Sequence, residues 1–262
     1  NKLFKDPSKF SYDLGDAFLK LNKPEKAVDN WLAFLDKVPA QKARIQSTFT
    51  RNLNKEGFQD ALETQLYSKI QEKPNNLVYP ELLIWLFTNQ KDFESALTQA
   101  KALDKKQKED GYRVLKLSTN AMNEKEYDAA ISGYEYIISK GEEFRYYLMS
   151  KSGILKARKQ KVIEENTYTQ EDLLALKTDY EDYISLYGSS SANANTVSDL
   201  ANLEANYLGN LDKGIQLISD LLNQPGLDKK TKNKLKLDLG DIYILSGDVW
   251  EAVLLYQQVN KD

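Results

Sequence analysis

Apolar side chains recur along this chain with the spacing of amphipathic helices. Within residues 93–103 they follow one another at intervals of three and four: Phe93, Ala96, Leu97, Ala100 and Leu103. This spacing places them on one face of a helix, and no segment shows the sustained apolar–polar alternation that is typical of a strand. The chain also has only 12 Gly and 6 Pro in 262 residues, which favours helix. The pattern predicts an all-α fold.

The helical pattern recurs as a longer unit. A Leu-Gly pair is followed by an aromatic residue three positions after the glycine, an alanine twelve after it and an aromatic four beyond that alanine. This series begins at Leu14-Gly15 and again at Leu239-Gly240. Matching alanines of second helices follow at steps of 34, 35 and 34 residues: Ala27, Ala61, Ala96 and Ala130. A period of this length is typical of helical hairpins that stack into a solenoid.

Two glycines are expected where the paired helices of a hairpin cross. A side chain at Gly15 or Gly240 would push the two helices apart. The small partners on the second helices are Ala27, Ala61, Ala96, Ala130 and Ala252, and the space beside these alanines is filled by Trp31, Tyr134 and Tyr256. Each hairpin leaves one face uncovered, and that face is buried when the next hairpin stacks on it.

The regular step breaks after Ala130, because the next clear equivalent, Gly214, lies 84 residues later. We expect one enlarged repeat in this interval, with Ala175 as its small second-helix residue. Its long first helix is predicted from about Glu142 to Ile163, and its second helix begins after Thr169, which can cap it.

The chain resembles tetratricopeptide-repeat (TPR) proteins at these positions. The residues that carry the resemblance are Leu14-Gly15-x-x-Phe18 with Ala27, Trp31 and Pro39, and Leu239-Gly240-x-x-Tyr243 with Ala252 and Tyr256. Over essentially its whole length it is also similar to one family of large TPR proteins from Bacteroidota, through residues 82–93, 100–105, 134–141, 168–174 and 237–243. That resemblance implies an internal segment of a cell-envelope protein, periplasmic or outer-membrane associated, whose signal peptide has been removed.

The sequence therefore predicts a single right-handed, TPR-like α-solenoid over residues 1–262, with about seven helical hairpins of which the fifth is enlarged. The repeats are expected at residues 8–41, 42–76, 77–110, 111–141, 142–188, 195–226 and 229–262, and the resemblance implies further repeats beyond both ends. The last helix, Trp250–Val259, is apolar and lacks the polar face of a terminal repeat. We expect another repeat or a partner chain to cover it.

The composition limits the kinds of catalytic and metal site that the chain can form. The chain has no histidine and no cysteine, which excludes imidazole and thiolate metal sites, Ser-His-Asp and Cys-His catalysis, and disulfides. Its net charge of −3 argues against a nucleic-acid partner. The longest apolar run, Leu82–Phe87, is far shorter than the roughly 18 residues of a membrane span. We expect no catalytic residue, no cofactor, no metal and no direct membrane span.

The sequence has a repeat pattern and no catalytic signature. Together these predict a non-catalytic scaffold that binds other proteins through its concave groove and its ends. The candidate groove residues lie on first helices: Tyr12, Asp16, Trp85, Tyr112 and Asp241. The resemblance does not extend to chaperone-binding TPR proteins, because the Lys, Asn and Arg that clamp a terminal carboxylate are missing at these positions. For Trp85, ordinary packing within its apolar helix is the simpler interpretation.

Two other functions stay open. The chain could be a structural spacer or assembly subunit of an outer-membrane or secretion complex, or a carbohydrate-active α/α enzyme, which would need a deep pocket with two carboxylates about 5–10 Å apart.

The basic run at residues 151–161 could meet an acidic partner, although the acidic residues at 171–182 offer compensation within the chain.

Overall fold

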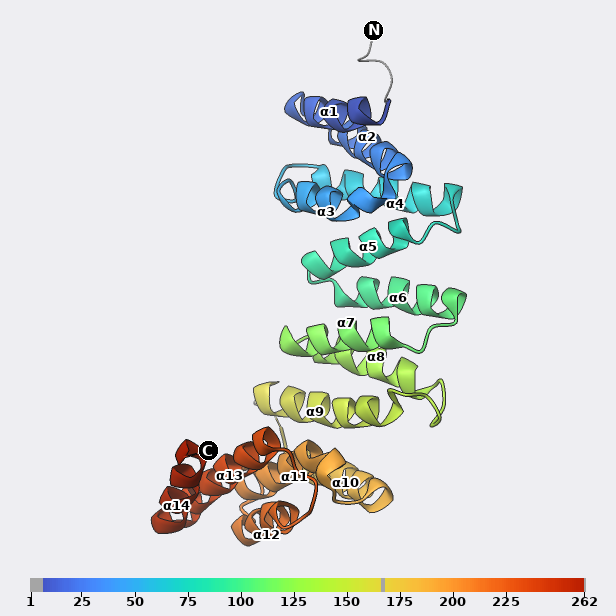
Figure 1. Cartoon of the computed structure of the whole chain (residues 1–262). Helices are drawn as coiled ribbons and strands as arrows, with labels where there is room; N and C mark the ends of the chain where they lie inside the picture. The colour runs from blue at the N-terminus through green and yellow to red at the C-terminus, as the bar shows by residue number, and fades with distance from the viewer. Residues whose placement is uncertain (1–6, 166–167, 262) are drawn as a thin grey trace. The chain divides into compact units, whose positions relative to one another are not determined.

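Helices form all the regular secondary structure that the computed structural model describes, which is the backbone of residues 7–165 and 168–261 (Figure 1). Within these ranges there are fourteen α-helices and two short 3-10 turns, at Pro39–Gln41 and Ser191–Asn193, and no strand. The prediction of an all-α fold is confirmed.

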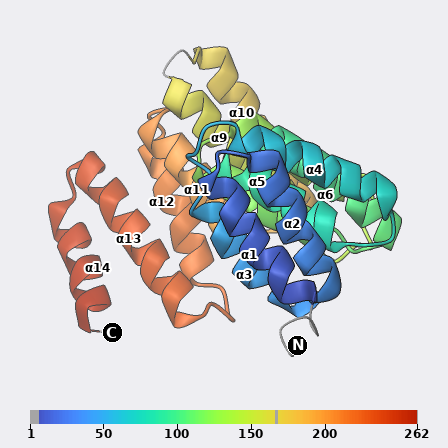
Figure 2. The same cartoon turned by 90° about the horizontal axis from the view of Figure 1, so that it is seen from above.

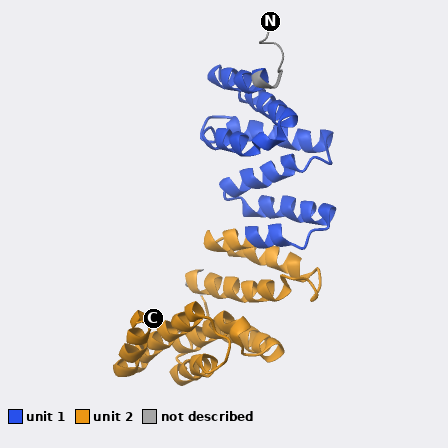
Figure 3. Cartoon of the chain, in the orientation of Figure 1, with its two compact units in different colours: residues 1–117 blue, residues 118–262 orange. Residues whose placement is uncertain are grey.

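The chain divides into two compact units, residues 1–117 and 118–262, with the boundary inside α7 (Figure 3). Unit 1 contains α1 (Pro7–Lys20), α2 (Pro24–Lys37), α3 (Lys42–Thr50), α4 (Phe58–Glu72), α5 (Val78–Asn89), α6 (Phe93–Gln107) and the start of α7 (Tyr112–Asn123). Unit 2 contains the rest of α7 and α8 (Tyr127–Ile138), α9 (Tyr147–Glu165), α10 (Gln170–Tyr187), α11 (Ala194–Asn206), α12 (Leu211–Leu222), α13 (Lys229–Ser246) and α14 (Val249–Lys261).

Consecutive helices pack as hairpins, for example α1 with α2, α5 with α6, α11 with α12 and α13 with α14. The next hairpin covers the face that its predecessor leaves open, as where α13 packs on both α11 and α12. The resulting core of unit 2 includes Val197, Ile218 and Leu239, each from a different helix and each almost fully buried.

The two expected glycine crossings are present. A Cβ atom on Gly15 would lie 2.6 Å from Cδ1 of Trp31, and one on Gly240 would lie 2.6 Å from Cε1 of Tyr256. Because such distances are too short for any side chain, glycine allows the ring of the second helix to lie against the first helix.

A third crossing of this kind joins α8 to α9. A Cβ atom on Gly153 of α9 would lie 2.8 Å from the ring of Tyr134 on α8. Accordingly, α9 packs more extensively on the preceding helix α8 than on α10, with which the repeat pattern pairs it. The enlarged fifth hairpin is therefore more open than the next one, α11 with α12.

Two details of the predicted fifth repeat are wrong. The first helix begins at Tyr147 instead of about Glu142, because Gly141 has a left-handed φ of +121° and the residues after it form turns. Ala175 is exposed, so it is not equivalent to the buried alanines of the other second helices; its neighbour Leu176 is buried instead.

The predicted start of the second helix in this repeat is confirmed. Asp172 N donates to Thr169 Oγ1 at 3.2 Å, and Thr169 N donates to the Asp172 carboxylate at 2.8 Å. This reciprocal capping box satisfies two backbone donors at the start of α10.

Cations of the basic run at 151–161 are compensated within the chain. Arg158 pairs with Asp179 of α10 at 2.7 Å, as the sequence indicated. The next two cations use acids that the sequence did not single out: Lys159 pairs with Asp199 at 2.9 Å and Lys161 with Asp128 at 2.7 Å. Three of the five cations of the run thus tie α9 to α10, α11 and α8.

We expect Gly240→Leu to lower the free energy of unfolding by about 1–3 kcal/mol, because the new side chain overpacks the crossing with Tyr256. Urea unfolding followed by circular dichroism measures the change. Lys232→Leu, at an exposed position of the same helix, is the control and should be near neutral. An unaltered midpoint in Gly240→Leu would contradict the close crossing.

Thr169→Ala is expected to remove the capping box and destabilise unit 2 by about 0.5–2 kcal/mol. Thr178 lies on the same helix, is exposed and bonds only to its own preceding turn. Equal losses in Thr169→Ala and Thr178→Ala would show that the cap contributes nothing beyond helix propensity.

Candidate functional site

An open cleft separates α1 from α3 in unit 1. Its volume is about 760 Å³, and its lining combines one carboxylate, two guanidinium groups and three hydroxyl groups: Tyr12, Asp16, Arg44, Ser47, Thr50 and Arg51. The cleft brings together two of the predicted groove residues, Tyr12 and Asp16, with four residues that the sequence did not single out.

Tyr12 forms the floor of this cleft and is not an exposed anchor. Only 8% of it is exposed, and its Oη lies 2.8 Å from Thr48 Oγ1. The guanidinium carbon of Arg44 lies 4.0 Å from the centre of the Tyr12 ring and 5.9 Å from that of Phe34. The exposed group at this place is therefore the arginine, which lies over an aromatic surface.

Arg44 and Arg51 reach the same cleft because they are seven residues apart, which is two helical turns. Both are exposed, and neither forms an ion pair with a carboxylate among the residues that the structure describes. Their spacing is visible in the sequence, but nothing there shows that this face of α3 meets Tyr12.

Trp85 and Tyr112 lie elsewhere in unit 1. Trp85 is half-buried, with its ring centre 6.3 Å from that of Phe49, so it packs into the core as the simpler interpretation stated. Tyr112 is 58% exposed at a smaller cleft beside Arg113, which forms ion pairs with Glu81 and Glu109. The structure does not bring either aromatic into the cleft between α1 and α3.

Asp241, the candidate in unit 2, has a structural partner. Its carboxylate accepts a hydrogen bond of 2.7 Å from Tyr256 Oη. This bond, with a smaller contribution from burial, raises the pKa of Tyr256 to about 12. Asp241 thus fixes the ring that lies over Gly240 and closes the last hairpin.

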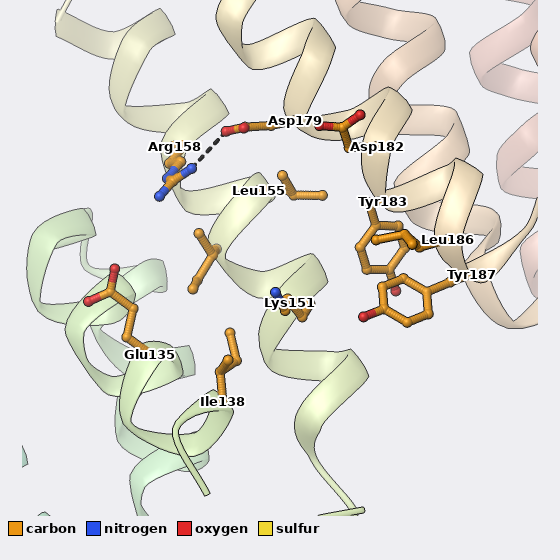
Figure 4. A pocket seen from close by; sticks show the side chains of 11 residues that line it. Glu135, Ile138, Lys151, Leu155, Arg158, Asp179, Asp182, Tyr183, Leu186 and Tyr187 are labelled. Atoms are coloured by element: carbon orange, nitrogen blue, oxygen red, sulfur yellow. Dashed lines mark hydrogen bonds and ion pairs between the residues drawn. The ribbon is translucent and has the colours of Figure 1, made fainter. Parts of the chain in front are cut away.

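A pocket that the sequence did not reveal lies between α8, α9 and α10 (Figure 4). Its volume of about 360 Å³ is within the range of small-ligand pockets. Apolar and aromatic side chains form most of its wall, principally Ile138, Leu155, Tyr183, Leu186 and Tyr187. Its wall joins side chains of three helices, so it depends on packing and not on any motif.

Charged groups surround this pocket. Figure 4 shows Arg158 reaching from α9 to Asp179 on α10, where their ion pair of 2.7 Å spans the opening. Two further carboxylates, Glu135 and Asp182, line the pocket and form no ion pair within the described part of unit 2. Lys151 lies 5.6 Å from the ring centre of Tyr147. Apolar walls with charges of both signs suit a peptide segment better than a bare ion.

No group of three or more acidic residues in the described part of the chain is arranged to hold a metal ion. Among the described helices, none is long and apolar enough to cross a membrane.

The raised pKa of Tyr256 predicts a pH dependence of stability. The folded chain holds this phenolic proton more tightly than the unfolded chain, whose tyrosines titrate near 10. The stabilisation is therefore complete below pH 10 and is lost as the pH rises from about 10 to about 12. Tyr256→Phe lacks this proton, so its free energy of unfolding should not show this part of the decrease above pH 10.

Urea unfolding across that pH range tests the prediction, with Tyr112→Phe, at an exposed tyrosine of unit 1, as the control. The free-energy difference between the wild type and Tyr256→Phe should shrink above pH 10. A difference that stays constant up to pH 12 would rule out the bond to Asp241 as its source.

Similarity to known proteins is confined to structure. No protein-family model matches the sequence, and a search of curated proteins returns no match. A tetratricopeptide-repeat protein from Parabacteroides merdae aligns over 97% of this chain and 92% of its own, at 14% identity and a TM-score of 0.45.

Two further solved structures have a TM-score of 0.50. BtubC from P. vanneervenii is 17% identical over 87% of this chain and 90% of its own. Human IFIT1, solved as a dimer with PPP-AAAA, is 13% identical over 97% of this chain and 64% of its own. Together with the helical hairpins and their 34-residue step, these likenesses show that the chain has the fold of tetratricopeptide-repeat proteins.

Proposed function

We propose that this chain is a non-catalytic protein–protein interaction scaffold of the bacterial cell envelope. The observation that carries the proposal is the cleft between α1 and α3, where Arg44 and Arg51 are exposed above the ring of Tyr12. The envelope location, periplasmic or outer-membrane associated, rests on the sequence resemblance alone.

The cleft offers the chemistry of peptide recognition. A guanidinium group can donate two parallel hydrogen bonds to a carboxylate, and Arg44 is already oriented by its stacking on Tyr12, so less conformational entropy is lost on binding. Ser47 and Thr50 add hydroxyl groups for the peptide backbone. Asp16 places a single carboxylate in the same cleft and would disfavour a uniformly acidic ligand.

These features fit a partner segment that places one or two carboxylates against α3. A pure spacer or assembly subunit would not need a stacked, unpaired arginine at this position. The mixed lining of the cleft therefore favours the scaffold, whereas an assembly role is the second candidate because α14 has an apolar exposed surface.

Arg44→Gln is expected to reduce capture of the partner by roughly tenfold or more, as for the loss of an interface arginine. The measurement is affinity capture from a detergent extract of envelope membranes followed by quantitative mass spectrometry. Arg145→Gln is the matched control, because Arg145 is also exposed and lies 5.5 Å from the ring centre of Tyr146.

A partner that is lost with Arg44→Gln and kept with Arg145→Gln supports the proposal. If the wild type, Arg44→Gln and Arg145→Gln capture the same set of proteins, this cleft is excluded as the binding site. Fractionation of the native cells tests the location separately, and recovery of the protein in the cytosolic fraction would remove the envelope from the proposal.

A further inference from the structure

The pocket between α8, α9 and α10 has an apolar floor. Ile154, Leu155 and Tyr183 line it and are almost fully buried, whereas Leu186 at its edge is 75% exposed. Helices α9 and α10 are neighbours in both views of the chain (Figures 1 and 2). Every residue of this pocket belongs to unit 2, so it is a site separate from the cleft between α1 and α3 of unit 1.

The two tyrosines of the pocket offer their rings to a ligand, because their hydroxyl groups already have partners. The ring centres of Tyr183 and Tyr187 lie 4.9 Å apart. Tyr183 Oη donates to Asn193 Oδ1 at 3.2 Å, and the hydroxyl of Tyr187 shares a hydrogen bond with that of Tyr147. These bonds hold the rings in place, and the rings add apolar and π surface to the pocket.

The charged groups of the pocket leave an excess of hydrogen-bond acceptors. The ion pair with Arg158 neutralises Asp179. Glu135 and Asp182 are exposed and pair with no cation in the described part of unit 2, and Figure 4 shows them on opposite sides of the apolar side chains. Lys151 is the remaining cation of the lining. Two free carboxylates, which only accept hydrogen bonds, thus outnumber one ammonium group.

We propose that this pocket binds a basic peptide segment of a partner protein, in which cationic side chains stand on either side of an apolar one. The apolar side chain packs on Leu155 and Tyr183, and the cations reach Glu135 and Asp182. Arginine suits both parts of the pocket, because its hydrocarbon stem covers apolar surface while its guanidinium group stacks on a tyrosine ring or pairs with a carboxylate.

An acidic segment or a sugar fits the pocket less well. An acidic segment would bring its carboxylates next to Glu135 and Asp182, and such like charges repel. A sugar needs donors and acceptors along its ring, whereas the floor is apolar and the tyrosine hydroxyl groups are already bonded within the chain.

Methyl NMR spectroscopy of the 262-residue chain tests the proposal, because Ile138 and Ile154 both line the pocket. The probe is N-acetyl-Arg-Gly-Leu-Gly-Arg-amide, since alternate residues of an extended peptide share one face. It should shift both methyl signals in a saturable way. The uncharged control, with Gln in place of Arg, should bind roughly tenfold more weakly, as for the loss of two exposed ion pairs.

Variants of the chain test the same contacts from the other side. Glu135→Gln/Asp182→Asn should weaken binding of the basic peptide roughly tenfold. Asp212→Asn/Asp220→Asn makes the same change in net charge at two exposed positions of α12 and should leave binding intact. Circular dichroism should give the same helix content for both double variants, since every substituted side chain is exposed.

The sign of the charge preference has its own test. Lys151→Gln removes the cation that opposes the ligand, so it should strengthen binding of the basic peptide. Glu135→Lys/Asp182→Lys should exchange the preference, and N-acetyl-Glu-Gly-Leu-Gly-Glu-amide should then bind more tightly than the basic peptide.

The proposal is overturned if the basic and uncharged peptides bind the wild type equally, or if Glu135→Gln/Asp182→Asn binds the basic peptide as tightly as the wild type does. It also fails if neither methyl signal moves up to about 10 mM basic peptide. Tighter binding of the acidic peptide by the wild type would assign the pocket to an acidic ligand, held by Lys151 and Arg158. None of these substitutions lies in unit 1, so the outcome is independent of the test with Arg44→Gln.

Discussion

The close contact of an aromatic ring on one helix with a glycine on its neighbour determines how these helices can be arranged. Trp31 over Gly15 and Tyr256 over Gly240 draw the two helices of a hairpin together at either end of the chain. Since one turn of helix then has no side chain at the crossing, the ring lies directly against the backbone of the first helix. The remaining face of each hairpin is left for the next hairpin to cover.

The same contact explains the irregular part of the chain. Gly153 lies under Tyr134, which belongs to the preceding helix, so α9 is drawn to α8 and away from its own hairpin partner. The second helix, α10, shares an apolar core with α9 and α11, which includes Leu155, Leu176 and Leu203, and the ion pair of Arg158 with Asp179 also joins it to α9. The pocket of Figure 4 is the space that this change of partner leaves.

Side chains that form contacts inside the structure are not available to bind a partner. Tyr12, Trp85 and Asp241 were predicted as groove residues, and the structure uses each of them in internal contacts. In place of Tyr12, the exposed group at the first cleft is Arg44, which uses the tyrosine as its support. A first-helix position that faces a groove in the repeat pattern is therefore not by itself an available anchor.

The sequence alone determined the class of fold, the step of the repeats and the two terminal glycine crossings. Each of these depends on contacts within one hairpin, and residues at spacings of three, four and twelve report such contacts directly. The cap of α10 was equally visible, because Thr169 and Asp172 are three residues apart.

Only the tertiary structure decided the rest. The shift of α9 towards α8, the stacking of Arg44 on Tyr12 and the position of the pocket each involve residues from different repeats. The exposure of Ala175 likewise depends on how α10 packs. Such contacts depend on how far apart neighbouring helices are held, and that distance is set by the summed volume of many side chains. No local spacing in the sequence records it.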